Sequence, residues 1–105
     1  MDQKKVERVI MLVGGQFTSI VEKALASPKP SVLTRVDAAK TVEDCLAVHE
    51  SAYRCSLEES LALYRAMSLS TTPEHWARCF CETRKGSPEE ALCAHMAYEL
   101  LPDEK

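Results

Sequence analysis

Hydrophobic residues recur at helical spacing along most of the chain. No segment alternates apolar and polar residues for long enough to predict a strand, so the pattern predicts an all-α protein. Residues 3–26 show the spacing most regularly, and their apolar side chains fall on one face of a helix. That face carries Val6, Val9, Ile10, Val13, Phe17, Ile20, Val21 and Ala24. The chain is therefore predicted to begin with an amphipathic helix.

A glycine pair, Gly14 and Gly15, lies in the middle of this first predicted helix. Each glycine costs a helix about 1 kcal/mol relative to alanine. The pair therefore indicates either a bend or a close approach by another element. Two prolines in "SPKPSVLTR" then end the helix and predict a linker over residues 28–40.

Residues 41–67 are predicted to form a second, longer helix. "TVED" supplies Thr41 as the N-cap, with Asp44 three positions later in an approximate capping box. One apolar line along this helix contains Leu46, His49, Tyr53, Leu57, Leu61, Tyr64 and Met67. A second line, mostly of small side chains that permit close helix approach, contains Cys45, Val48, Ala52, Cys55, Ala62, Leu63 and Ala66. This helix is therefore expected to have two neighbours.

Two shorter helices are predicted to follow. The first begins after "SLSTTP", with Thr71 or Thr72 as its cap and Pro73 in its first turn. "KGSPEE" predicts a helix stop and a new start, through Gly86, Ser87, Pro88 and Glu90. No internal repeat is apparent in the sequence.

Composition and charge limit the classes of function. A chain of 105 residues has room for one compact unit, and its 46% hydrophobic and 28% charged residues are typical of an ordered protein. A net charge of −3 without a basic stripe argues against nucleic-acid binding. The longest apolar run is shorter than the roughly 20 residues of a membrane span. Asp2 and Glu7 make the N-terminus a poor secretory signal or cleavable presequence, so we expect protein partners and no direct membrane span.

Five cysteines carry the most specific chemical signal. On a continuous helix Cys45 and Cys55 would lie about 15 Å apart and could not bond to each other. An antiparallel return after "SLSTTP" would bring Cys55 to Cys79 or Cys81, and Cys45 to Cys93. Two bridges can be made in fifteen ways that each leave one thiol free, so the residues alone do not fix the pairing.

A C-x₉-C helix followed by a turn and a second cysteine-bearing helix resembles the coiled-coil-helix-coiled-coil-helix proteins of the mitochondrial intermembrane space. Tyr53 in "AYRC" is similar to the aromatic residue that usually precedes the second cysteine there. The second motif departs in length, with C-x₁₁-C from Cys81 to Cys93. The resemblance implies an antiparallel hairpin stapled by two disulfides, with Cys45 bonded to Cys93 and Cys55 to Cys81.

The resemblance also implies a division of the chain and a function. Residues 1–27 would be an N-terminal docking helix, 28–40 a linker, 41–101 the stapled hairpin and 102–105 a tail. Most members of the family are small structural subunits or assembly factors of inner-membrane complexes, so we expect a non-enzymatic accessory subunit of the respiratory chain or ATP synthase that needs no cofactor. The residues expected to contact partners are the exposed apolar ones, Val9, Ile10, Met11, Leu12, Val13, Phe17, Leu46, Tyr53, Leu57, Leu61 and Tyr64.

Two other interpretations stay open. All five cysteines could be reduced and buried in a cytosolic helical adaptor or regulator, because cysteine is among the most buried residue types. A zinc module is the weaker alternative, with ligands Cys79, Cys81, Cys93 and His95. A catalytic role for His49 beside Cys45 is less favoured than packing, since His49 lies on the apolar line. No catalytic sequence motif is present, so no enzyme is predicted.

Overall fold

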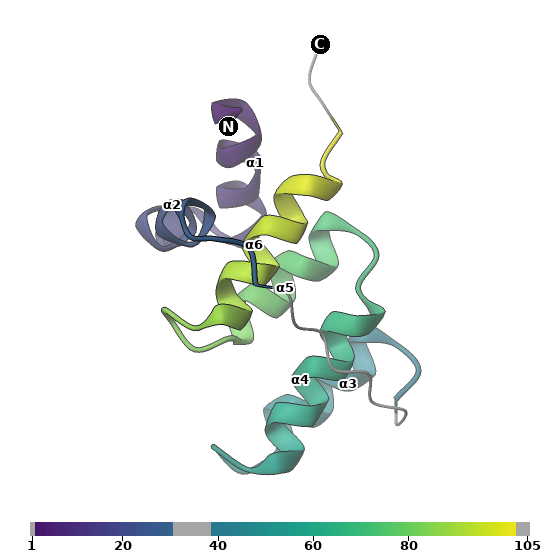
Figure 1. The fold of residues 1–105 in the computed structure, drawn as a ribbon. Helices are drawn as coiled ribbons and strands as arrows, with labels where there is room; N and C mark the ends of the chain where they lie inside the picture. Colours follow the sequence, from purple (N-terminus) through teal and green to yellow (C-terminus); the bar gives the residue numbers. More distant parts are fainter. Residues whose placement is uncertain (1, 31–38, 103–105) are drawn as a thin grey trace. The chain divides into compact units, whose positions relative to one another are not determined.

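The computed structural model describes residues 2–30 and 39–102, and every regular element in them is helical (Figure 1). This confirms the all-α prediction. The elements are α1 (Gln3–Val13), the 3₁₀ turn η1 (Gly15–Phe17), α2 (Thr18–Ala26), α3 (Val42–Ser51), α4 (Leu57–Leu69), α5 (Pro73–Glu82) and α6 (Pro88–Leu100).

The chain forms two compact units. Unit 1 combines residues 1–31 with residues 72–105, and unit 2 is residues 32–71. The prediction kept residues 41–101 together and apart from residues 1–27, whereas this division falls between residues 71 and 72, and α1 and α2 pack with α5 and α6 in unit 1. Much of the predicted linker (31–38) and most of the predicted tail (103–105) lie outside the described residues.

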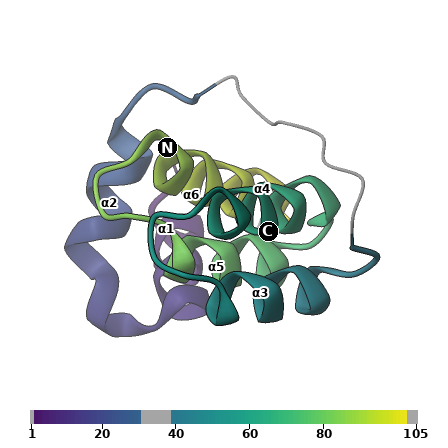
Figure 2. The same ribbon diagram turned by 90° about the horizontal axis from the view of Figure 1, so that it is seen from below.

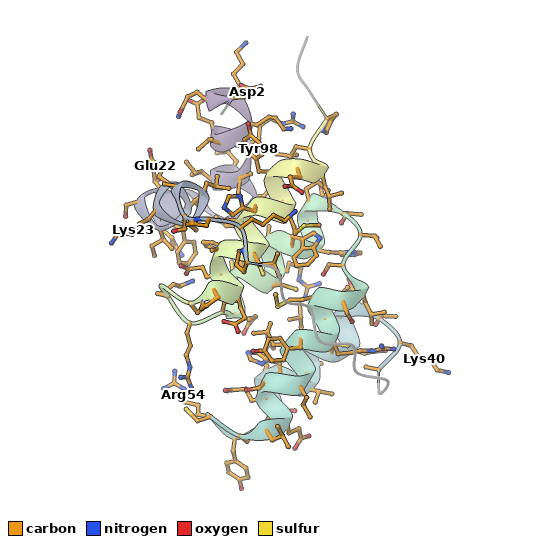
Figure 3. All side chains as sticks on the ribbon, viewed as in Figure 1. Asp2, Glu22, Lys23, Lys40, Arg54 and Tyr98 are labelled. Carbon is orange, nitrogen blue, oxygen red and sulfur yellow. The ribbon has the colours of Figure 1, made fainter. Side chains whose placement is uncertain are left out.

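Unit 1 is built on α5 and α6, which run side by side, with α1 against α5 and α2 against α6 (Figure 2). Its largest fully buried side chains include Trp76 and Phe80. The rings of Phe17 and Phe80 meet edge to face at 6.4 Å. The two ends of the unit are also joined, since the Asp2 backbone N–H donates a 2.7 Å hydrogen bond to the Tyr98 hydroxyl (Figure 3).

The first predicted helix, residues 3–26, is broken at Gly14. Gly14 has φ +98°, a backbone conformation that only glycine adopts at low cost. It separates α1 from η1 and α2, so the glycine pair produces a break. A Cβ atom added to Gly15 would meet nothing within 4 Å, which gives no sign of a close contact there.

Residues 41–67 form two helices in the structure, so the prediction of one continuous helix there is wrong. α3 ends at Ser51 and α4 begins at Leu57, and the two pack together as a hairpin. The hydroxyl of Ser56 accepts from the Glu59 N–H at 3.1 Å, while the Glu59 carboxylate accepts from the Cys55 N–H at 3.0 Å. This capped start of α4 lies inside an uninterrupted apolar periodicity, so spacing alone did not show it.

The starts of α5 and α6 confirm the predicted caps. Thr72 accepts from the His75 N–H at 3.2 Å and caps α5. Ser87 accepts from the Glu90 N–H at 3.2 Å, and the Glu90 carboxylate accepts from the Gly86 N–H at 3.0 Å.

The α3/α4 and α5/α6 hairpins follow one plan, which corrects the prediction that the sequence has no repeat. The first helices have 10 residues each and the second helices 13 each. The cap Thr72 lies 31 positions after Thr41, and Ser87 lies 31 positions after Ser56. Cys55 and Gly86, also 31 positions apart, both have positive φ, at 63° and 83°. The identical pairs are Thr41/Thr72, Glu43/Glu74, Ser56/Ser87, Glu58/Glu89, Glu59/Glu90, Leu61/Leu92, Ala66/Ala97 and Leu69/Leu100.

Substitutions at the two equivalent turn positions, Cys55 and Gly86, should change folding stability in opposite directions. Gly86→Ala should lower the free energy of unfolding by about 1 kcal/mol, because a Cβ atom is unfavourable at positive φ. No neighbour lies within 4 Å of that Cβ position, so the effect is one of backbone conformation. Cys55→Gly should raise stability by up to about 1 kcal/mol in the reduced protein. Urea denaturation with reductant measures both, and Cys55→Ser, which keeps the Cβ atom, is the control. A stabilised Gly86→Ala variant would contradict the assignment.

Candidate functional site

The predicted partner-binding residues divide between the core and the surface. Val9, Val13 and Leu46 are buried and have almost no surface to offer a partner. Met11, Tyr53 and Leu57 are 77%, 90% and 74% exposed. The remaining ones are partly exposed: Ile10, Leu12, Phe17, Leu61 and Tyr64.

The α3/α4 hairpin carries an open apolar groove of about 560 Å³. It is lined by Ala39, Cys45, Val48, Leu57, Glu58, Leu61, Ala62 and Arg65, and we call it the α3/α4 groove. Leu57 and Leu61 come from the predicted apolar line, and Cys45, Val48 and Ala62 come from the predicted line of small residues. Folding the predicted helix back on itself brings members of both lines to one surface. The sequence pattern predicts Val48 and Ala62 as packing positions and not as partner-binding ones.

Local hydrogen bonds hold the walls of the α3/α4 groove. His49 Nδ1 lies 2.9 Å from the Glu59 carbonyl oxygen, which links the end of α3 to the start of α4. Arg65 donates from Nε and Nη2 to the Ala39 carbonyl oxygen, at 3.0 and 2.8 Å. These bonds tie α3 and the segment just before it to α4, which carries the other wall of the groove.

Two opposite charges lie along the α3/α4 groove. Glu58 is in the first turn of α4 and Arg65 is seven positions later. At a rise of 1.5 Å per residue they are about 10 Å apart along the helix, with apolar Leu61 between them. The groove therefore has an acidic end, an apolar middle and a basic end.

All five cysteines are free thiols in the structure. Cys45, Cys79 and Cys93 are buried, and Cys55 and Cys81 are exposed. Cys45 and Cys55 belong to unit 2 and the other three to unit 1. Each predicted disulfide would therefore join one unit to the other, and both pairings stay predictions.

The surroundings of Cys45 and Cys93 keep these two thiols protonated. Burial raises the pKa of Cys45, and the nearby Arg65 guanidinium opposes that rise only in part. Burial raises the pKa of Cys93 well above the ordinary thiol value of 9.0, and Cys79 and the Glu89 carboxylate add to the rise. A thiol is a nucleophile only as the thiolate, so neither group is activated for catalysis at neutral pH.

The four residues of the zinc alternative do not form a metal site in the part of the chain that the structure describes. Within residues 2–30 and 39–102, no three His, Cys, Asp or Glu side chains are grouped closely enough to hold a metal ion. The His95 ring instead lies 2.7 Å from the Ser27 carbonyl oxygen, through Nε2. Across the same described ranges, no helix has the length and apolar character needed to cross a membrane.

Comparison with known proteins gives no relative for this chain: no family model, no curated protein and no solved structure matches it.

The buried thiol of Cys93 predicts a loss of stability in alkaline solution. The pKa of this thiol is raised in the folded state. The protonated thiol therefore contributes fully to folding stability below the unfolded-state pKa of about 9, and this contribution is lost as pH rises above that value. The free energy of unfolding should therefore fall between pH 9 and the folded-state pKa by about 1.4 kcal/mol per unit of that interval. Cys93→Ala should show a shallower decline. Denaturation with reductant across that range measures both slopes, and equal slopes would exclude Cys93 as the cause.

Proposed function

We propose that this protein is a non-enzymatic accessory protein that docks on a larger protein complex through the α3/α4 groove. The observation that carries the proposal is the groove itself, an open apolar surface in which Leu57 is 74% exposed. Fully burying a leucine-sized side chain contributes about 1.5–3 kcal/mol. Contiguous exposed apolar surface of this kind is typical of interaction sites.

The side chains of the groove support binding better than catalysis. Its ionisable groups are Cys45, Glu58 and Arg65. The Cys45 thiol has a raised pKa, and Arg65 is held by the Ala39 carbonyl. This set lacks a general base next to an activated nucleophile.

The cysteine spacing supports a specific setting for the accessory role. The resemblance to the coiled-coil-helix-coiled-coil-helix family favours a subunit or assembly factor of a respiratory-chain or ATP synthase complex, at the intermembrane-space side of the inner membrane. Bonds from Cys45 to Cys93 and from Cys55 to Cys81 would tie unit 2 to unit 1. In the chain-entropy model, bridges that close loops of this size stabilise by roughly 3–4 kcal/mol each.

A second candidate is a cytosolic adaptor with reduced thiols. The observation that favours it is the burial of Cys45, Cys79 and Cys93 as free thiols, the ordinary position of structural cysteines. In addition, Cys45 lies on α3 while Cys55 lies beyond its end, so the first motif is not one continuous helix.

Counting thiols separates these two settings. We expect the stapled subunit, denatured without reductant in excess iodoacetamide, to take up one carbamidomethyl group and to take up five after reduction. The reduced adaptor would take up five in both cases. Intact-mass spectrometry of protein isolated from its native source, with acid quenching to prevent exchange, gives the count. Five groups without reductant would exclude the stapled form.

Removing the apolar character of the groove should release the protein from its complex. Leu57→Asp should weaken docking by at least about tenfold, because a charge would replace an anchoring side chain. Aspartate is favourable in the first turn of α4, so the variant should fold. Ala47→Asp, at an exposed position of α3 outside the groove, is the matched control. Native electrophoresis of tagged variants should find the wild type and Ala47→Asp in a large assembly and Leu57→Asp free. Wild-type protein that migrates alone would contradict the proposal.

A further inference from the structure

We infer that the occupant of the α3/α4 groove is an amphipathic α-helix of a partner protein, with a basic side chain that faces Glu58. The inference rests on the proposed docking function and adds the class of partner. Three properties of the groove carry it: its place in the repeated hairpin, the nature of its walls and its charges.

The repeated hairpin shows how this face is used elsewhere in the same chain. The counterparts of Val48, Leu61 and Ala62, 31 positions later, are Cys79, Leu92 and Cys93. All three counterparts are buried in the folded chain, and so is Ala62, whereas Val48 is 38% exposed and Leu61 partly exposed. Helical repeats bury such positions against further helices. Val48 and Leu61 therefore stay open at positions that the second hairpin buries, while Leu57 and its counterpart Pro88 are both exposed.

The walls of the groove accept a helix better than an extended strand. Both walls are α-helices whose backbone groups are already paired within α3 and α4, so they have no row of free N–H and C=O groups for a strand to join. From Leu57 to Arg65 the groove runs about 12 Å, or two helical turns. That length fits the i, i+4 and i+7 side chains of one bound helix. The small side chains of Ala39, Cys45 and Ala62 allow close approach.

Shape and charge favour a partner over a second copy of this chain. A two-fold dimer would place the same patch on both sides, and two concave grooves do not fill each other. A single helix is convex and can fill a concave groove. The carboxylate of Glu58 at the acidic end of the groove then favours lysine or arginine on that helix.

Binding of synthetic helical peptides tests this inference on the isolated chain. The probes are two labelled alanine-based peptides of about 15 residues. Both carry leucines at i, i+4 and i+7, and one has lysine and the other glutamate beside the leucine at one end. Fluorescence anisotropy should show the lysine peptide binding about threefold more tightly to the wild type, with Glu58→Lys reversing that preference. Leu57→Asp and Val48→Asp, on opposite walls, should each weaken both peptides by at least about tenfold.

A lysine peptide with a central proline, which cannot stay helical, is the control for conformation. Equal binding of this peptide, or no binding of either helical peptide, would overturn the inference. A dimer in sedimentation that Leu57→Asp dissociates would also overturn it in favour of a second copy. A chain that binds the peptides yet migrates alone in native extracts contradicts the proposed function only. A chain that joins its complex through Leu57 but binds no helical peptide contradicts this inference only.

Discussion

The capped helix starts at Ser56 and Ser87 are the interactions on which the rest of the structure depends. In each, a serine hydroxyl and a glutamate carboxylate satisfy backbone N–H groups that the first helical turn leaves unpaired. A single cap contributes about 1 kcal/mol, which is modest for a whole domain. Its larger effect is positional, because the chain must leave the helical conformation just before it. At Ser56 this turns one long apolar run into two packed helices, and without that turn the α3/α4 groove would not exist.

The same hairpin plan serves two purposes because equivalent positions carry different side chains. At one position in the first helix, His49 lies beside the Glu59 carbonyl of its own hairpin, whereas its counterpart Phe80 packs on Phe17 in the core of unit 1. Both rings are buried, so the hairpins differ in exposure at the neighbouring position, where Val48 is 38% exposed and its counterpart Cys79 is fully buried. The α3/α4 hairpin therefore keeps an exposed face, and the α5/α6 hairpin contributes its corresponding residues to the buried interior.

The sequence predicts a helix boundary of this structure when the residues that usually end or start a helix, such as glycine and proline, occupy it. The boundary at Gly86 and Ser87 was predicted because glycine and proline flank the cap. The equivalent boundary at Cys55 and Ser56 was missed because cysteine occupies the positive-φ position and apolar spacing continues across the turn. For the site, Leu57 and Leu61 were predicted as partner-binding residues. Helical periodicity cannot tell a buried stripe from an open one, however, so Val9 and Val13 were assigned to partners although they form core.

The predicted disulfides would connect the shape of the α3/α4 groove to the redox chemistry of the compartment. With a free thiol, Cys45 is a small, protonated side chain in the lining of the groove, and the groove is shaped by α3 and α4 alone. With Cys45 bonded to Cys93, that lining would be tied covalently to unit 1, so oxidation would set the shape of the groove and the placement of the two units together. A partner helix would then meet a surface completed only in an oxidising compartment. In the proposed docking, the redox state of Cys45 would therefore determine whether one hairpin or the whole stapled chain forms the binding surface.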